Sequence, residues 1–109
     1  MIDSFFFINY YGGEYMYSID IKKLLKLNNP IIIDIRNISK YNNNHIPGSI
    51  HIDEYNLTNN PSQYLDKDNT YYIYCDFGNR SKRLVYYLNS LGFRCVNING
   101  GYNNYLLER

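Results

Sequence analysis

The run Ile31-Ile32-Ile33 constrains the fold of this chain more strongly than any other short segment. It is continuous in hydrophobicity and consists of β-branched residues, a pattern that is typical of a strand buried on both faces of a parallel sheet. Apolar and aromatic runs predict further strands over residues 14–17, 49–52, 70–74 and 94–98. Helices between such strands complete an α/β architecture with a largely parallel sheet.

Helical patterns separate these strands and predict helices over residues 19–27, 81–91 and 102–108. Ser18 is a residue type that caps helix N-termini, and Gly92 is placed to end the second helix. The Asn-rich segments 42–44 and 59–60 are interpreted as polar loops. We expect one domain over residues 1–109, in which residues 1–13 form either an N-terminal extension or an added edge element.

Composition argues against several classes of protein. With 19% charged residues and a formal net charge of +1, the chain lacks the basic surface that binds nucleic acid or an anionic membrane. No segment has the apolar length of a transmembrane helix, and the N-terminus lacks the basic start of a signal peptide. Cys75 and Cys95 are too few for a disulfide scaffold, and the absence of a C-x-x-C pair argues against a zinc site. We therefore expect a cytoplasmic protein with free thiols.

Cys75 directly follows the apolar strand 70–74, and a helical pattern starts at Ser81. Ligands of open α/β sheets bind beyond the carboxyl ends of the strands. A loop that turns at Gly78, together with the free N–H groups of the helix start, forms a ring of donors that binds anions. We predict that this ring lowers the pKa of the Cys75 thiol and makes it a nucleophile. Arg80 opposes the helix dipole, and we interpret it as a binding group for an anionic substrate.

Three other side chains receive structural interpretations. Cys95 lies within a predicted strand and is expected in the core, where free cysteines are often found. His45 is expected to hydrogen-bond a loop, because its spacing gives it no partner nucleophile. His51 lies in a strand and is expected to pack there.

Three motifs together resemble the rhodanese, or sulfurtransferase, superfamily. The loop CDFGNRS (75–81) is similar to the family's active-site pattern C-x-x-G-x-R-S. Upstream, IIIDIR (31–36) and HIPGSIHI (45–52) resemble its strand ending in Asp-x-Arg and its H-I-P-G turn. Downstream, LNSLGFRCVNINGGYNNYL (88–106) resembles its G-F and G-G segment, with Tyr105 where the family often has Trp. The resemblance covers about residues 14–107, in matching order and spacing.

The resemblance implies a rhodanese-like fold, with a mostly parallel five-stranded central sheet flanked by helices on both faces. It also implies a sulfurtransferase: the Cys75 thiolate takes a sulfane sulfur from thiosulfate or a persulfide and passes it to a thiol or cyanide. No metal or organic cofactor is required, because the carrier is a transient cysteine persulfide. Asp34 and His45 are the expected supporting residues. The expected substrate-binding residues are Asp76, Phe77, Gly78, Asn79, Arg80, Ser81 and Arg36.

Two of these expectations leave alternatives open. Arg36 contacts the substrate, or it forms a purely structural ion pair. The expected partners are a small sulfur donor and, as an acceptor, a protein thiol; nucleic acid and membranes are not expected. The oligomeric state is either a monomer or a homodimer.

Asp76 bears on the choice of sulfur donor. A carboxylate beside the thiolate raises the thiol pKa and repels thiosulfate if it turns inward, whereas a solvent-facing carboxylate has a small, screened effect. We therefore hypothesise that thiosulfate is a poor donor, and that a protein persulfide or a low-molecular-weight persulfide is the real one.

Two rival functions stay open. Cysteine phosphatases and arsenate reductases also combine a cysteine, a ring of N–H donors and an arginine, but with the pattern C-x5-R. The shorter C-x4-R spacing from Cys75 to Arg80 forms a tighter cradle, which suits a single sulfur atom better than a tetrahedral oxyanion. The second rival is a non-catalytic interaction or regulatory module, since many rhodanese-like domains lack the cysteine. This chain has it, so a sulfurtransferase is favoured.

Overall fold

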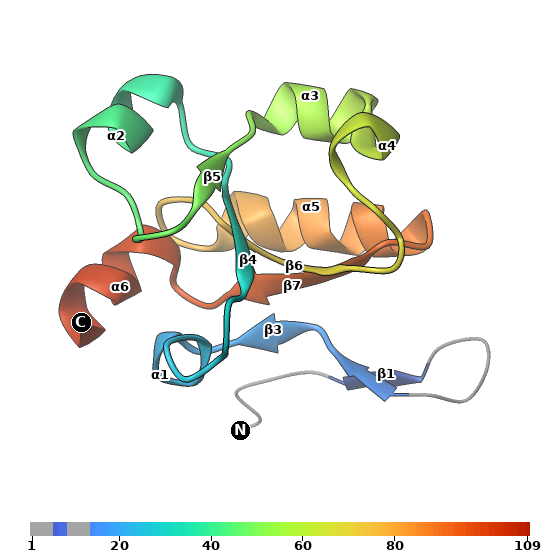
Figure 1. Cartoon of the computed structure of the whole chain (residues 1–109), viewed down its shortest axis with the longest axis horizontal. Coiled ribbons are helices and arrows are strands. Elements are labelled where there is room, and N and C mark those ends of the chain that lie inside the picture. Colours follow the sequence, from blue (N-terminus) through green and yellow to red (C-terminus); the bar gives the residue numbers. More distant parts are fainter. Residues whose placement is uncertain (1–5, 9–13) are drawn as a thin grey trace.

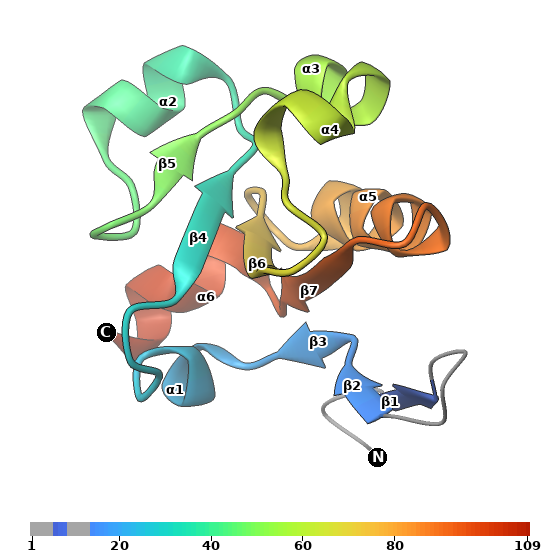
Figure 2. The same ribbon diagram turned by 45° about the vertical axis from the view of Figure 1, so that its right-hand side comes forward.

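A five-stranded sheet with helices on both of its faces dominates the structure (Figure 1, Figure 2). The computed structural model describes residues 6–8 and 14–109. The strands follow the order β3-β7-β6-β4-β5, and every neighbouring pair is parallel. The predicted α/β architecture is therefore confirmed. The strands are β3 Ser18–Ile19, β4 Ile31–Asp34, β5 Ile50–His51, β6 Thr70–Tyr74 and β7 Arg94–Ile98.

The helices divide between the two faces of the sheet. Helices α3, α4 and α5 lie on one side, and α1 and α6 lie on the other (Figure 2). Within the described part of the chain, none of them is long and apolar enough to span a membrane. Their bounds are α1 Ile21–Leu24, α2 Ile38–Asn43, α3 Glu54–Asn59, α4 Pro61–Tyr64, α5 Asn79–Ser90 and α6 Gly101–Glu108.

The sheet separates two apolar cores, because successive side chains of a strand point to opposite faces. Cys95 is fully buried in the first core, which confirms its expected place. Tyr105 packs against the second core, so an aromatic ring still fills the position at which the family often has Trp. The first core includes Ile33, Ile73, Cys95, Leu57, Val85 and Leu88, and the second includes Ile32, Tyr74, Val96, Ile98 and Leu24.

The helix predicted over residues 19–27 is wrong in its extent. Ser18 and Ile19 form β3 and pair with Asn97 and Ile98 of β7, so Ser18 is a strand residue rather than a helix cap. Helix α1 begins only after Asp20. Pairing with the edge of the sheet satisfies the backbone groups of β3, and this tertiary contact outweighs the local capping preference.

Helices α2 and α3 extend into the Asn-rich segments 42–44 and 59–60 and end at Asn43 and Asn59, so the prediction of loops is wrong for residues 42, 43 and 59. Their N-caps, Asn37 and Asp53, each accept a hydrogen bond from the backbone N–H three residues later. Helix α2 buries none of its side chains, and α3 buries only Leu57. The apolar periodicity that reveals a helix in a sequence is therefore missing, although the caps are present.

The strand predicted over residues 14–17 exists in part but does not join the large sheet. Strand β2 (Glu14–Met16) pairs antiparallel with β1 (Phe6–Ile8), and the edge of the large sheet is β3. Residues 1–5 and 9–13 of the expected N-terminal segment lie outside the described residues.

Candidate active site

Cys75 follows β6 at the middle of the sheet, and its loop leads into α5. The loop is shorter than predicted, because Asn79 and Arg80 already belong to the first turn of the helix. Gly78 is the N-cap and has a φ of 98°. A Cβ there would be strained and would lie 3.0 Å from the backbone nitrogen of Gly100. Only glycine therefore suits the turn that points the following N–H groups back toward the thiol.

Backbone N–H groups and one hydroxyl surround the sulfur of Cys75. The N–H groups of Gly78 and Ser81 donate to Sγ at 3.2 and 3.4 Å, and Oγ of Ser81 lies 3.3 Å from Sγ. Burial alone raises the pKa of this thiol, but the hydrogen bonds from Ser81, Gly78 and the backbone of Phe77 outweigh burial and lower the pKa below its usual value. These donors therefore stabilise a thiolate on a single sulfur atom.

Ser81 connects the thiol to strand β7. It is fully buried, and its Oγ lies 2.6 Å from Oδ1 of Asn97 and 3.3 Å from the carbonyl oxygen of Gly78, in addition to its contact with Cys75. A hydroxyl carries one proton, so Ser81 donates to only one of these three neighbours at a time.

The first turn of α6 braces the loop. The N–H groups of Tyr102 and Asn103 donate to the carbonyl oxygens of Cys75 and Asp76 at 2.9 and 3.0 Å. A Cβ at Gly101 would collide with the carbonyl oxygen of Cys75, so glycine allows the helix to come this close. The two bonds satisfy carbonyl groups of the loop and hold its backbone while the N–H groups of Gly78 and Ser81 face the sulfur.

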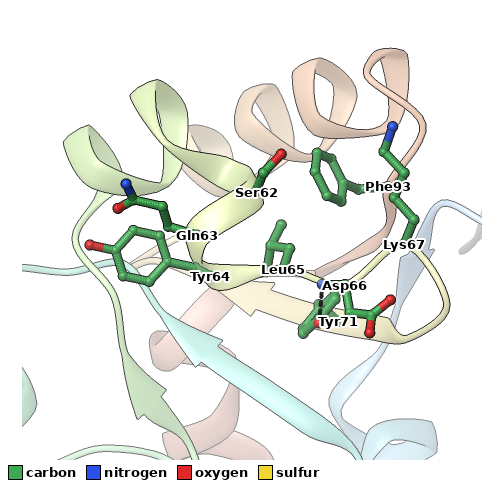
Figure 3. A pocket seen from close by; sticks show the side chains of 8 residues that line it. All are labelled: Ser62, Gln63, Tyr64, Leu65, Asp66, Lys67, Tyr71 and Phe93. Atoms are coloured by element: carbon green, nitrogen blue, oxygen red, sulfur yellow. Dashed lines mark hydrogen bonds between the residues drawn. The ribbon is translucent and has the colours of Figure 1, made fainter.

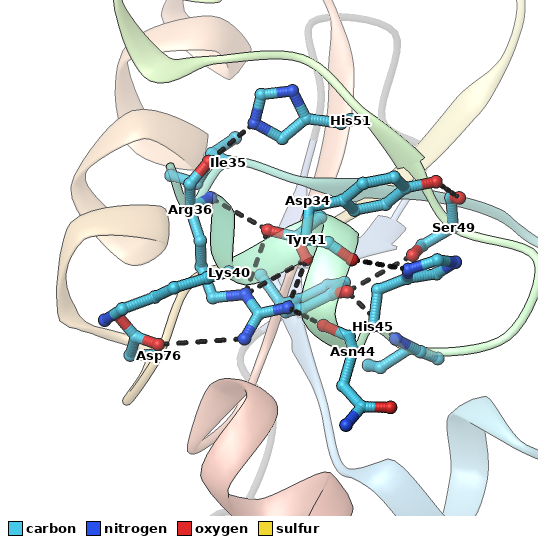
Figure 4. A network of polar contacts seen from close by, with 12 residues as sticks. Asp34, Ile35, Arg36, Lys40, Tyr41, Asn44, His45, Ser49, His51 and Asp76 are labelled. Atoms are coloured by element: carbon cyan, nitrogen blue, oxygen red, sulfur yellow. Dashed lines mark hydrogen bonds and ion pairs between the residues drawn. The ribbon is translucent and has the colours of Figure 1, made fainter. Parts of the chain in front are cut away.

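Asp34, the last residue of β4, and Arg36 form a buried ion pair (Figure 4). Nη2 of Arg36 donates to Oδ2 of Asp34 at 2.8 Å and to the carbonyl oxygen of Asn44 at 2.6 Å. The guanidinium also lies 4.1 Å from the ring centroid of Tyr102. Burial alone lowers the pKa of Arg36, but Asp34 more than offsets this and raises it. These contacts favour the structural ion pair over a substrate contact.

Asp76 directs its carboxylate at two cations (Figure 4). Its Oδ2 lies 2.8 Å from Nζ of Lys40, and its Oδ1 lies 3.9 Å from Nη1 of Arg36. Asp76 therefore pairs with cations of neighbouring elements rather than opposing the thiolate.

Arg80 is also held in an ion pair. Its Nε donates to Oε1 of Glu54 at 2.9 Å, and its Nη2 donates to the carbonyl oxygen of Ile35 at 3.2 Å. The side chains of Arg80 and Glu54 are 43% and 40% exposed, so this pair lies at the rim of the site. Phe77 and Asn79, the other predicted binding residues, are exposed, and the contribution of Phe77 to the thiol comes from its backbone.

The two histidines hold neighbouring backbone segments. Nδ1 of His45 lies 2.8 Å from the carbonyl oxygen of Tyr41, and the two rings stack. Nε2 of His51 lies 2.6 Å from the carbonyl oxygen of Arg36. These contacts match the loop-binding role expected for His45. Among residues 6–8 and 14–109, no three His, Cys, Asp or Glu side chains cluster as metal ligands would.

The sequence matches the family model described as Rhodanese-like domain over residues 19–108. The chain belongs to the rhodanese-like domain family. No curated protein matches it significantly. Among solved structures, it is similar to SSP1007 of Staphylococcus saprophyticus, with 33% identity, a TM-score of 0.74, and coverage of 83% of this chain and 93% of that one. A rhodanese-related protein of Thermoplasma volcanium shares 27% identity, with a TM-score of 0.73 and coverage of 84% and 92%. The human single-domain sulfurtransferase TSTD1 shares the fold, with 17% identity, a TM-score of 0.72 and coverage of 84% and 96%.

Sequence reasoning missed three residues of this rhodanese-like site. Lys40 pairs with Asp76, and Glu54 pairs with Arg80. No local sequence pattern predicts these two residues, because they come from separate helices. Asn97 could have been noticed, since it is a polar residue within the otherwise buried run of β7. A buried polar side chain in an apolar strand requires a partner, which here is Ser81.

A surface cavity of about 540 Å³ lies away from Cys75 in this rhodanese-like domain (Figure 3). It is open near the amino-terminal end of β6, whereas Cys75 follows the carboxyl end of that strand. Asp66 donates its backbone N–H to the hydroxyl oxygen of Tyr71 at 2.6 Å. The cavity is lined by Ser62, Gln63, Tyr64, Leu65, Asp66, Lys67, Tyr71 and Phe93.

Proposed function

We propose that this protein is a sulfurtransferase that carries a sulfane sulfur as a persulfide on Cys75. The observation that best supports the proposal is the convergence of the N–H groups of Gly78 and Ser81 on one sulfur atom with a lowered pKa. Sulfur transfer needs a thiolate nucleophile near neutral pH. The outer sulfur of a persulfide is also anionic, and the start of α5 offers it a favourable potential.

The proposed cycle has two balanced steps. In the first, the Cys75 thiolate attacks the outer sulfur of a donor persulfide; a new S–S bond forms, the donor S–S bond breaks, and the donor leaves as a thiolate. In the second, an acceptor thiolate attacks the outer sulfur held on Cys75, takes it as a new persulfide and releases the Cys75 thiolate. With cyanide as the acceptor, the product is thiocyanate. Each step breaks one S–S bond and forms one new bond to the transferred sulfur, an S–S bond with a thiol or an S–C bond with cyanide. No metal, redox partner or organic cofactor therefore takes part.

A persulfide suits the rim of this site better than thiosulfate does. Thiosulfate is a dianion, and its binding gains most from unpaired cations. The cations around the site are instead neutralised, so the local charge is balanced, and we propose a low-molecular-weight or protein persulfide as the donor. The reason is neutralised cations rather than repulsion by an inward Asp76. The pairs are Arg36 with Asp34, Lys40 with Asp76, and Arg80 with Glu54.

Releasing the cations tests the choice of donor. Asp76→Asn and Glu54→Gln each free one cation at the rim, and we expect them to raise kcat/KM for thiosulfate by about threefold to tenfold, the scale of a partly exposed charge interaction. The kcat/KM for a persulfide donor should change much less. Unchanged kcat/KM for thiosulfate in both variants would remove the basis of this donor assignment.

Mass spectrometry tests the proposed function itself. Incubation with glutathione persulfide or thiosulfate should add one sulfur atom, about 32 Da, to Cys75, and an acceptor thiol should remove it. Cys95→Ala is the matched control, because Cys95 is the other buried thiol, and it should keep the adduct. Cys75→Ser should lose it. Absence of the adduct with every donor would favour an interaction module, and phosphatase activity well above that of Cys75→Ser would favour the phosphatase.

A further inference from the structure

Asn97 is a buried amide that contacts the residue beside the thiol. Its side chain reaches Oγ of Ser81 at 2.6 Å, and the residue is 3% exposed. Within residues 6–8 and 14–109, its Nδ2 group makes no hydrogen bond of its own, so no second contact holds the amide in one orientation. An amide offers an acceptor at one end and a donor at the other. Turned one way it accepts the Ser81 proton, and turned the other way it donates to Ser81.

The charge on the Cys75 sulfur decides which orientation is stable. When Sγ is a thiolate, the Ser81 hydroxyl gains most by donating its single proton to the sulfur 3.3 Å away. Oγ of Ser81 is then free to accept a hydrogen bond, and Nδ2 of Asn97 can donate it. When Sγ is neutral, the hydroxyl donates to Oδ1 of Asn97 at 2.6 Å instead. Hydrogen bonds in such a buried chain polarise one another, so each state stabilises its own arrangement.

We propose that Asn97 is a positioning residue whose amide reverses with the charge on Cys75. In one orientation it donates to Ser81, so that the Ser81 hydroxyl donates to the thiolate. In the other it accepts from Ser81, so that the hydroxyl no longer donates to a neutral sulfur. In a persulfide the charge moves to the outer sulfur and leaves the inner one neutral. The amide would therefore reverse once in each half of the cycle. That second statement rests on the proposed function; the coupling between the amide and the unloaded thiol does not.

The charged groups nearest Cys75 are held in ion pairs. The uncharged side chains of Ser81 and Asn97 are therefore the groups that can change their hydrogen bonds when the thiol ionises. The carboxylates and cations nearest the loop each have an opposite charge within 4 Å, and the hydroxyl of Tyr74 accepts from the N–H of Ile46. The paired groups are Asp34, Arg36, Lys40, Asp76, Arg80 and Glu54. The elements around Cys75 also carry Lys82 and Arg83 on α5, Tyr71 and Tyr72 on β6, Arg94 and Cys95 on β7, and Tyr102 on α6.

An NMR titration of the whole chain tests the coupling directly. The side-chain amide signals of Asn97 should shift with pH at the same midpoint as the alkylation rate of Cys75. The shift should be largely lost in Ser81→Ala, which keeps Cys75 and Asn97 and removes the hydroxyl that connects them. The side-chain amide of Asn89, which binds the backbone of Cys95 at 2.7 and 3.0 Å, is the control signal and should not follow Cys75. An Asn97 signal that does not titrate, or that titrates equally in Ser81→Ala, would overturn the proposal.

A charge substitution gives a second, independent readout. In Asn97→Asp the carboxylate only accepts, so it keeps the Ser81 proton away from the sulfur, and the midpoint for alkylation of Cys75 should rise by about one pKa unit, a tenfold loss of thiolate. The rise should be smaller in a Ser81→Ala background. Asn89→Asp is the matched charge control and should leave the midpoint in place. An unchanged midpoint, or the same rise in both backgrounds, contradicts the proposal. If Asn97→Asp does not fold, the NMR titration of the parent chain decides alone.

These readouts use the unloaded thiol and so separate two outcomes. Loss of sulfur transfer with an intact coupling would reject the proposed function and leave the role of Asn97. Sulfur transfer without the coupling would reject the role of Asn97 and leave the proposed function.

Discussion

Cys75 and Cys95 belong to the same buried cluster on one face of the sheet, yet their thiols are shifted in opposite directions. Burial raises the pKa of Cys95 to about 12. Burial acts in the same direction on Cys75, but the hydrogen bonds to its sulfur outweigh it. Cys95 lies inside β7, where its N–H and carbonyl groups bind Asn89. Cys75 lies one residue beyond β6, where the chain turns and points N–H groups at the sulfur. Position at a strand end, rather than burial, therefore activates the thiol.

The largest effect that we expect from this comparison is on reactivity at neutral pH. The pKa of Cys95 is about 12 against 9.0 for an unperturbed thiol, and that of Cys75 lies below the latter. Iodoacetamide should therefore alkylate Cys75 at least about a thousandfold faster than Cys95 in the folded chain. Peptide mapping of the alkylated protein measures both rates. In denaturant the two rates should become similar, and similar rates in the folded state would contradict the comparison.

The next largest effect concerns the turn that makes Cys75 different. Gly78→Ala should lower the free energy of unfolding by about 1–3 kcal/mol, the cost of a strained backbone, and should raise the pKa of Cys75 by displacing its donors. Gly48→Ala is a matched control, because Gly48 also has a positive φ, of 83°, but has open space around it. Gly48→Ala should lose stability without altering the thiol. Urea denaturation and the pH profile of alkylation distinguish the two, and equal profiles would refute the role of Gly78.

The pH dependence of stability should have opposite signs for the two cysteines. The folded-state pKa of Cys75 is lowered, so its ionisation adds stability above the unfolded pKa and loses it as pH falls through the folded pKa. The folded-state pKa of Cys95 is raised, so stability falls as pH rises from the usual thiol value toward about 12. Urea denaturation of Cys75→Ala and Cys95→Ala between neutral and alkaline pH should therefore show opposite changes relative to the parent chain. Changes of the same sign would show that the two shifts do not differ.

The smallest effect is expected at Phe77. The residue is 67% exposed, and its backbone contributes one of the hydrogen bonds that lower the pKa of Cys75, after those of Ser81 and Gly78. Phe77→Ala keeps that backbone group, so the alkylation midpoint should move by less than about 0.3 pKa units, the scale of a minor surface change. A larger shift would mean that the exposed ring, and not only the turn, sets the difference between the two cysteines.

Segments in which a run of apolar residues coincides with a buried strand could be predicted well from the sequence. The strands at 70–74 and 94–98 have the predicted bounds, because each is a buried run that only a central strand accommodates. Helix α2 could not be predicted, since it buries no side chain and so leaves no periodic pattern. Ser18 has the chemistry of a helix N-cap, which is visible in a sequence, whereas the edge of β7 with which it pairs is not.

Sequence patterns suffice to show that Cys75 follows a buried strand, that a glycine turn and a helix come next, and that the chain belongs to the rhodanese-like family. Which side chains meet at that turn follows only from the folded arrangement of the strands and helices. Asp76 meets Lys40 across 36 positions, Arg80 meets Glu54 across 26, and Asn97 meets Ser81 across 16. A local pattern encodes backbone conformation and burial. It carries no record of partners that become neighbours only when parallel strands place their carboxyl ends at one edge of the sheet.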